Sequence, residues 1–296
     1  MSRIQEALSK AAREKADRAS VEPVRDVVDI ASEARRSSEA PPPARPAAVN
    51  PDLETRGYSA AFEEIESRCA HVEWKLDPQV NLFIKGTKGK VVAERFRTLR
   101  SRLYQIADTR PLKRIMITSS VSSEGKSFVC ANLAQSLVHH QNRRVLLIDA
   151  DLRLPSLHRL LSASRTPGLT NYLRGDVDEF KVIQKGTENN LYFIPAGEEV
   201  TTPSELLLND RMKKLMDFAS ETFDWVIIDS PPALPVHDPS MLASLCDGVL
   251  FVVRAASTDV DLAVKASSEF RQKNLLGVVF NHAEPGETYG GAYYGT

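Results

Sequence analysis

Hydrophobic and polar residues alternate in blocks along the second part of the chain. From residue 114 onward, short apolar runs are separated by segments of mostly helical pattern; the runs read RIMITSS, RVLLID, LYFIP, DWVIID, GVLFVV and LLGVVFN. Strands that alternate with helices in this way are typical of βαβ units. The pattern therefore predicts an α/β fold, with a doubly wound, mostly parallel sheet and helices on both faces.

A helix of several turns is predicted upstream of these strands. In VVAERFRTLRSRLYQI, four apolar residues fall at helical spacing: Val92, Phe96, Leu99 and Leu103. Further upstream, residues 58–71 could form a short helix, and residues 71–84 could hold one or two strands.

The beginning of the chain has a different composition. Ile4, Ala7, Leu8 and two further alanines lie at helical spacing among charged residues, which predicts a short amphipathic helix. A solvated helical tail fits this pattern slightly better than a docking segment for another protein. Residues 26–52 contain APPPARPAAVNPD and cannot bury enough apolar surface to become ordered, so we expect a linker there.

The composition predicts one folded domain with extensions. The 296 residues, of which 42% are hydrophobic, suffice for one substantial core and some unpacked sequence. We expect three parts: residues 1–75 as a helix and linker that are largely disordered, residues 76–285 as the folded α/β domain, and residues 286–296 as a flexible tail.

Charge and cysteine usage narrow the function classes. The 38 basic and 39 acidic residues leave a net charge of -1, so no global field attracts nucleic acid, and no nucleic-acid partner is expected. The three cysteines and six histidines lack metal-ligand spacing, which indicates reduced thiols and no zinc site. No apolar run reaches the roughly 18 residues of a membrane span. We expect a cytoplasmic protein, in which any connection to the membrane goes through a partner.

The segment SVSSEGKS, residues 120–127, has the features of a phosphate-binding loop. It follows a predicted strand and precedes a predicted helix, so backbone N–H groups and a helix start would surround an anion. We predict that Lys126 bridges the β- and γ-phosphates of ATP and that the Ser127 hydroxyl binds Mg²⁺. The other residues expected to contact the nucleotide here are Ser122, Ser123, Glu124, Gly125 and Phe128.

Serine replaces glycine in this loop. Ser120 occupies the place of the usual first glycine, and Ser122 and Ser123 stand where more glycine is common. Because a residue with a Cβ atom resists positive φ, we expect nucleotide affinity or loop mobility to differ from that of loops with the usual composition.

Two apolar runs end in carboxylates, at the strand ends where α/β sheets bind ligands. Asp229 follows VII and precedes a Ser-Pro-Pro break; it is predicted to hold Mg²⁺ through the water shell of the ion, with helix capping as the alternative. Asp149 and Asp151 are two residues apart and project to the same side in extended structure. One would serve the Mg²⁺ shell, as Ser127 and Asp229 do, and the other would accept a hydroxyl proton.

The sequence does not assign these two roles, so Lys126, Asp149 and Asp151 are all candidate catalytic residues, and Asp151 is also a candidate metal ligand. Two further polar residues stand near strand ends. Arg153 could contact phosphate or pair with the carboxylates. Asn281 ends the run VVFN, where its amide could contact an adenine or simply begin a turn.

Three of the seven tyrosines, Tyr289, Tyr293 and Tyr294, lie in the final segment TYGGAYYGT. Its glycines would make the segment mobile enough to enter a cleft, where the phenols could accept phosphoryl groups. Each phosphorylation would add about -1.5 to -2 charges near neutral pH, and the repulsion could release the tail.

Together these motifs resemble the bacterial tyrosine kinase (BY-kinase) family, within the deviant phosphate-loop ATPases that include septum-site and partition ATPases. The resemblance rests on EGKS, LLIDADLR, VIIDSPP, the tyrosine-bearing tail and ERFRTLR, which matches an ExxRxxR helix through Glu94, Arg97 and Arg100. It covers roughly residues 75–296. The opening SRIQEALSKAA also resembles the exosortase-associated branch of these autokinases.

The resemblance implies a tyrosine autokinase that uses Mg·ATP. It also implies a ring-shaped homo-oligomer, for which an octamer is one candidate. The ExxRxxR helix would be a subunit contact in this ring, and the tail of one subunit would enter the site of its neighbour. The implied partners are a separate inner-membrane chain-length determinant, or polysaccharide co-polymerase, as activator and a cognate tyrosine phosphatase. The implied role is regulation of exopolysaccharide synthesis or export.

Two alternatives stay open at this point. The first is a nucleotide-switch ATPase with water as acceptor; it usually carries a second lysine early in the loop, where this chain has Ser120, Val121 and Ser122. The second is an ATP-binding scaffold of an export complex, which the unusual loop keeps open. Phe128, where a second hydroxyl is common, and the short tail also depart from the family's pattern.

Overall fold

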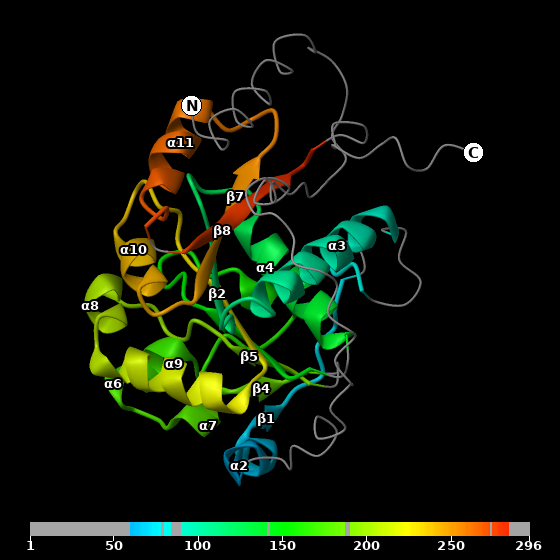
Figure 1. Cartoon of the computed structure of the whole chain (residues 1–296). Helices are drawn as coiled ribbons and strands as arrows, with labels where there is room; N and C mark the ends of the chain where they lie inside the picture. Colours follow the sequence, from blue (N-terminus) through cyan, green and yellow to red (C-terminus); the bar gives the residue numbers. More distant parts are fainter. Residues whose placement is uncertain are drawn as a thin grey trace.

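An eight-stranded sheet forms the centre of the computed structural model (Figure 1). The structure describes residues 60–77, 80–83, 90–140, 143–186, 190–272 and 274–283. Its strands are β1 (Ala70–His71), β2 (Arg114–Ser119), β3 (Val145–Asp149), β4 (Gln184–Lys185), β5 (Leu191–Ile194), β6 (Trp225–Asp229), β7 (Gly248–Arg254) and β8 (Leu275–Asn281).

The helices connect these strands and cover the sheet. They are α2 (Ala60–Arg68), α3 (Lys90–Ala107), α4 (Lys126–Val138), α5 (Leu157–Leu160), α6 (Leu169–Arg174), α7 (Glu179–Val182), α8 (Pro203–Leu207), α9 (Asp210–Thr222), α10 (Asp238–Ala243) and α11 (Val260–Ser268). The helix predicted around residues 92–103 is therefore confirmed as α3.

The strand order is β1-β4-β5-β3-β6-β2-β7-β8. Six of the seven neighbouring pairs are parallel, and only β4 and β5 run antiparallel to each other. The predicted doubly wound, mostly parallel sheet is thus confirmed. The register pairs Asp149 with Asp229, which brings two sequence-distant carboxylates to neighbouring strand ends.

The central strands are buried on both faces, which explains why they read as continuous apolar runs. Along β2, Ile115 and Ile117 pack into one core with α3 and α4, whereas Met116 packs into the other core with α6 and α9. Leu147 and Ile148 of β3 divide between the two cores in the same way. Each core therefore holds one helix layer against the sheet.

The folded domain begins upstream of the boundary expected at residue 76. Within α2, Phe62 and Ile65 are buried, and the Phe62 ring meets the rings of Tyr192 and Phe223 edge-on, with centroids 5.8 and 6.4 Å apart. Trp74 is also buried and packs against Phe193. Composition does not reveal these long-range contacts, so the described residues 60–75 belong to the packed domain although the boundary was expected at residue 76. Residues 1–59 and the tail 284–296 lie outside the described residues.

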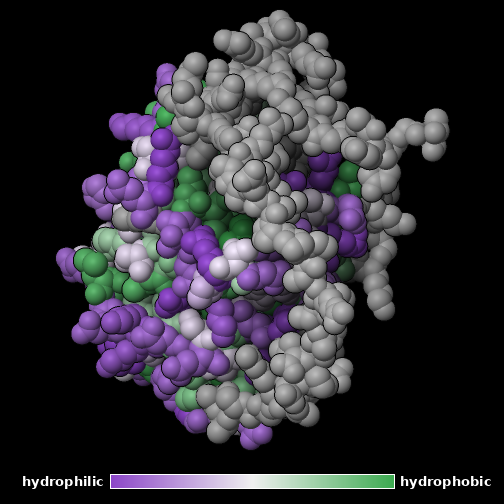
Figure 2. Space-filling model, in the orientation of Figure 1, coloured by the Kyte–Doolittle hydropathy of each residue, from purple (hydrophilic) through white to green (hydrophobic). Residues whose placement is uncertain are grey.

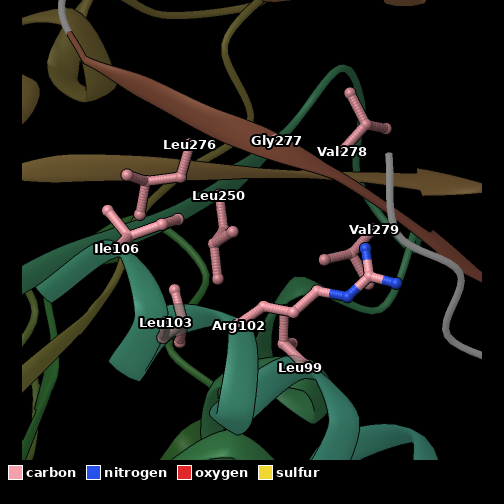
Figure 3. A pocket seen from close by; sticks show the side chains of 9 residues that line it. All are labelled: Leu99, Arg102, Leu103, Ile106, Leu250, Leu276, Gly277, Val278 and Val279. Atoms are coloured by element: carbon pink, nitrogen blue, oxygen red, sulfur yellow. The ribbon is translucent and has the colours of Figure 1, made fainter. Parts of the chain in front are cut away.

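A shallow apolar recess lies between α3 and the last two strands (Figure 3). Leu99, Leu103 and Ile106 of α3 face Leu250 of β7 and Leu276 of β8 across it. None of the predicted nucleotide-binding residues lines this recess. The recess results from the packing of α3 against the sheet, and it is separate from the polar residues at the strand ends.

Replacement of Phe62 tests whether α2 belongs to the folded unit. Phe62→Ala should lower the free energy of unfolding by about 3 kcal/mol, because it removes a buried ring from an aromatic cluster. Denaturant unfolding followed by circular dichroism measures this change. The exposed neighbour Glu63→Ala is the control and should change stability by less than about 0.5 kcal/mol. Equal stability of both variants would mean that α2 is not part of the unit.

Candidate nucleotide site

The segment between β2 and α4 forms a loop at the carboxyl edge of the sheet. Ser122 and Ser123 are exposed, and α4 begins at Lys126, so its free N–H groups face the loop. Gly125 has φ 92° and Ser123 has φ 67°, both in the left-handed region. Ser123 thus adopts a conformation that costs a residue with a Cβ atom about 1 kcal/mol. The expected conflict between serine and loop geometry is therefore located at Ser123.

Lys126 lies among buried carboxylates. Its Nζ atom is 2.8 Å from Asp151 Oδ2; the Asp151 side chain is almost fully buried, and that of Lys126 is 12% exposed. Burial alone would lower the pKa of Lys126, but the charges of Asp229 and Asp151 outweigh it and raise the pKa above its usual value. The lysine is therefore held in its charged form, as binding of phosphate oxygens requires.

Asp149 and Asp229 are fully buried side by side at the ends of β3 and β6. Burial raises the pKa of Asp229 to about 6, although Lys126 and the Ser127 hydroxyl act in the opposite direction. Burial, together with the charge of Asp229, also raises the pKa of Asp149 well above its ordinary range. The two strand ends therefore hold more negative charge than one lysine balances.

The structure separates the surroundings of Asp149 and Asp151. Asp149 Oδ2 accepts hydrogen bonds from the backbone N–H groups of Ser156 and Leu157, at 3.2 and 3.1 Å, and so holds the start of α5. Asp151 Oδ1 accepts from the backbone N–H of Leu154 at 3.0 Å, and its other oxygen contacts Lys126. Asp151 is thus the carboxylate that contacts Lys126, and Asp149 keeps one oxygen without a hydrogen-bond partner among the described residues.

Ser127 is buried at the first turn of α4, where its Oγ accepts a hydrogen bond from the Ser156 hydroxyl at 2.8 Å. Sequence reasoning missed Ser156. Its position directly before α5 is the helix-capping position that serine favours, and this signal places it at a helix start but not beside Ser127. Ser127 is therefore tied to the loop that follows the Asp149 and Asp151 strand.

Arg153 does not pair with the neighbouring carboxylates. Its guanidinium forms an ion pair with the buried Asp238, with Nε 2.8 Å from Oδ2, and donates to Ser204 Oγ at 2.9 Å. The ion-pair interpretation is thus correct in kind but wrong in partner, because Asp238 lies 85 residues along the chain. Arg153 anchors its loop to α8 and α10.

Hydrophobic surface gathers over α8 in Figure 2, and Leu208, directly after α8, is 66% exposed.

Two predicted nucleotide contacts have other surroundings. Phe128 is buried, and its ring packs 6.0 Å from the Phe96 ring of α3, so its side chain faces the core. Asn281 is buried; its Nδ2 donates to the Glu124 carbonyl at 2.9 Å, and its Oδ1 accepts from the backbone N–H of His282. The Asn281 amide is therefore engaged with the loop through one N–H and one lone pair, and its contact with adenine stays a prediction. Only the backbone of Phe128 remains available to a ligand.

The ExxRxxR residues of α3 face different directions. Glu94 and Arg97 form an exposed ion pair with 2.6 Å between Arg97 Nη1 and Glu94 Oε2. Arg100 instead donates to the Ser136 carbonyl near the end of α4, at 2.8 Å. Arg100 therefore links α3 to α4, and the expected subunit contact through all three residues stays a prediction. The tyrosines predicted as acceptors, Tyr289, Tyr293 and Tyr294, lie outside the described residues.

The donor set fits a magnesium ion held together with a nucleotide. Asp229 is buried, and neither of its carboxylate oxygens makes a well-formed hydrogen bond among the described residues, although the Ser127 hydroxyl and the Cys130 thiol face it. Oxygen ligands and retained waters suit Mg²⁺, which is usually bound through one or two carboxylates and the phosphates of its substrate. In the part of the chain that the structure describes, no group of three His, Cys, Asp or Glu residues is arranged to hold a metal without such a substrate. Ser127 and Asp229 are the side chains that would hold the ion.

No helix among the described residues is long and apolar enough to cross a membrane.

The fold and its loop define a P-loop domain, and comparison with known proteins places it further. A family model described as an AAA domain matches residues 112–261. The chain is 35% identical over 206 residues to tyrosine-protein kinase YwqD of Bacillus subtilis, covering 69% of this chain and 86% of that protein. It is 33% identical over 191 residues to tyrosine-protein kinase etk of Escherichia coli, covering 64% of this chain but 26% of that longer protein.

Two solved structures are similar in fold. The kinase domain of Escherichia coli tyrosine kinase ETK has a TM-score of 0.61 and 32% identity, over 67% of this chain and 80% of that chain. The chimerical protein CapA2B2 has a TM-score of 0.66 and 25% identity, over 76% of this chain and 100% of that chain. The chain belongs to the bacterial tyrosine kinase family.

The raised pKa of Asp229 predicts a stability gain when its charge is removed. A carboxyl group whose pKa rises from 3.8 to about 6 on folding binds its proton more tightly in the folded state. Its ionised form therefore destabilises the protein above pH 6, and the effect fades as the pH falls toward 4. Asp229→Asn should raise the stability of the nucleotide-free protein at pH 7.5 by on the order of 2 kcal/mol.

Thermal unfolding of both proteins at pH 7.5 and pH 4.5 measures the effect. The exposed Asp108→Asn serves as control and should leave stability within about 0.5 kcal/mol. A less stable Asp229→Asn protein at pH 7.5 would contradict the electrostatic account of the site.

Proposed function

We propose that the protein is an ATP-dependent tyrosine autokinase that transfers the γ-phosphoryl group to tyrosines of its own carboxyl-terminal tail. The observation that carries this proposal is the pairing of Lys126 with Asp151 at the start of α4, beside the buried Asp149 and Asp229. Phosphoryl transfer depends mainly on positioning and charge stabilisation, and this arrangement supplies both. The family relationship gives the acceptor class, because several relatives are named tyrosine-protein kinases.

Each side chain of the site has its own role in phosphoryl transfer. Lys126 leaves Asp151 to contact the β- and γ-phosphates, and the first N–H groups of α4 contact their oxygens. Ser127 and Asp229 would hold Mg²⁺, which would supply positive charge to the phosphates. The tyrosine oxygen forms a bond to the γ-phosphorus as the bond to the ADP oxygen breaks, and the phenol proton passes to a carboxylate. Asp151, freed from Lys126, is the carboxylate placed to accept it.

The rim of the site suits an aromatic acceptor. Val121 in the loop is 37% exposed, and Leu154, three residues after Asp151, is 67% exposed. Exposed aliphatic side chains beside a buried polar cluster offer contact area to the ring of a tyrosine, while its hydroxyl points toward the carboxylates. The acceptors on this proposal are Tyr289, Tyr293 and Tyr294, presented by a neighbouring subunit.

The assembly and its regulation are part of the same proposal. A ring of subunits would place one tail at the next subunit's site, with the exposed Glu94 and Arg97 of α3 in the contact. A separate inner-membrane chain-length protein would recruit and activate the ring, a phosphatase would reverse the modification, and the cycle would regulate exopolysaccharide synthesis or export. Support for these partners comes from the family resemblance.

Removal of the phosphate-binding lysine tests the kinase activity. The purified protein, incubated with Mg·ATP, should carry phosphate on Tyr289, Tyr293 or Tyr294 by mass spectrometry. Lys126→Met should reduce this phosphate by at least about a hundredfold, because it removes a charge that stabilises the transferring group. The exposed Lys181→Met is the matched control and should behave like the unaltered protein. Release of free phosphate with unmodified tyrosines would instead indicate a nucleotide-switch ATPase. If neither phosphotyrosine nor free phosphate formed, the protein would be a scaffold.

The proposed contact through α3 predicts a change of mass in solution. Arg97→Glu should lower the mass measured by light scattering, since it replaces an exposed cation of the contact by an anion next to Glu94. Arg271→Glu, also an exposed change from arginine, should leave the mass unchanged. Arg100 is unsuitable for this test because it binds the Ser136 carbonyl within the same subunit. An unchanged mass for Arg97→Glu would remove this face from the interface.

A further inference from the structure

The phosphate loop is fastened by a buried carboxylate within it. Glu124 is 2% exposed, and its Oε2 accepts a hydrogen bond from the backbone N–H of Val121 at 2.8 Å. Its Oε1 accepts from the Thr258 hydroxyl, in the segment between β7 and α11. Thr258 Oγ1 in turn accepts from the backbone N–H of Arg254 at the end of β7, at 3.1 Å, which fixes the direction of the hydroxyl. Glu124 thus joins the two ends of the loop to a second segment of the chain.

The end of the last strand fastens the same residue through its backbone. Asn281 Nδ2 donates to the Glu124 carbonyl at 2.9 Å. The amide also lies directly against Gly125, since a Cβ atom built there would be 1.8 Å from Asn281 Nδ2. Gly125 therefore serves twice, by allowing φ of 92° and by leaving room for the Asn281 amide.

We propose that Glu124, Thr258 and Asn281 form a brace that holds the phosphate loop in its anion-binding shape before nucleotide arrives. The three side chains are positioning residues, and the proposal rests on the proposed function in that this loop binds nucleotide. The loop needs such support because Ser123 is held at φ 67°, a conformation that an unsupported serine leaves readily. A loop ordered in advance binds its ligand with less loss of conformational entropy.

The brace makes a prediction that an adenine contact does not. A brace acts on the backbone N–H groups that surround the phosphates, so its loss weakens every ligand that carries the same phosphates. A contact between Asn281 and adenine would affect only ligands that carry the base. Binding of ADP and of pyrophosphate, which carry the same number of phosphates, each with saturating Mg²⁺, therefore separates the two roles of the amide.

Dissociation constants for the full chain, measured by calorimetry, test the brace. Thr258→Val removes the hydroxyl at nearly constant shape and should lower the affinity for ADP about tenfold. The Thr258→Ser protein keeps the hydroxyl and should bind ADP like the unaltered protein. Asn281→Ala should weaken the binding of ADP and of pyrophosphate by the same factor, also about tenfold. The melting temperature of each variant without nucleotide reports whether it is folded.

Two controls separate positioning from general stability. Thr222→Val removes a buried hydroxyl that bonds the Phe218 carbonyl in α9, and Asn209→Ala removes the cap of the same helix. Both should lower the melting temperature and leave the affinity for ADP unchanged. Unchanged affinity in both Thr258→Val and Asn281→Ala would overturn the brace, and so would an Asn281→Ala protein weakened toward ADP alone. Absence of ADP binding by the unaltered protein would overturn the proposed function as well.

Discussion

One ammonium group buried among three carboxylates governs the architecture of this site. Lys126 contacts Asp151, while Asp149 and Asp229 lie on neighbouring strands without a cation of their own within the described residues. Burial of unbalanced charge is expensive, and the raised pKa values of Asp149 and Asp229 express that cost. The site therefore carries charge that the protein alone does not balance. A ligand with positive charge near Asp229 and negative charge near Lys126 would balance it.

The rest of the fold places these four groups together. Parallel pairing of β3 with β6 sets Asp149 opposite Asp229, and pairing of β2 with β6 starts α4, and hence Lys126, beside them. The loop after β3 closes the cluster from the other side through Asp149, Ser156 and Ser127. Hydrophobic burial on both faces of the sheet keeps these strand ends fixed, because a slip in register would remove the apolar residues from the core.

The sequence predicted the parts of this structure that depend on local pattern. The central strands were recognised because both of their faces are buried, and Lys126, Asp151 and Asp229 because their motifs combine a loop with strand ends. The α2 packing was not predicted, since Phe62 is buried by residues more than 100 positions away. For the same reason, the pairing of Arg153 with Asp238 and of Asn281 with Glu124 could not be read from spacing.

The chain belongs to the bacterial tyrosine kinase family, and we interpret the charge cluster as its nucleotide site. A structure with bound nucleotide tests this interpretation most directly. The decisive measurement is the separation of Lys126 Nζ and Asp151 Oδ2, which is 2.8 Å here, in a crystal structure with Mg·ADP. The account predicts that Lys126 leaves Asp151 and contacts a phosphate oxygen, with the metal beside Ser127 and Asp229. An intact Lys126–Asp151 pair with nucleotide bound in the loop would contradict it.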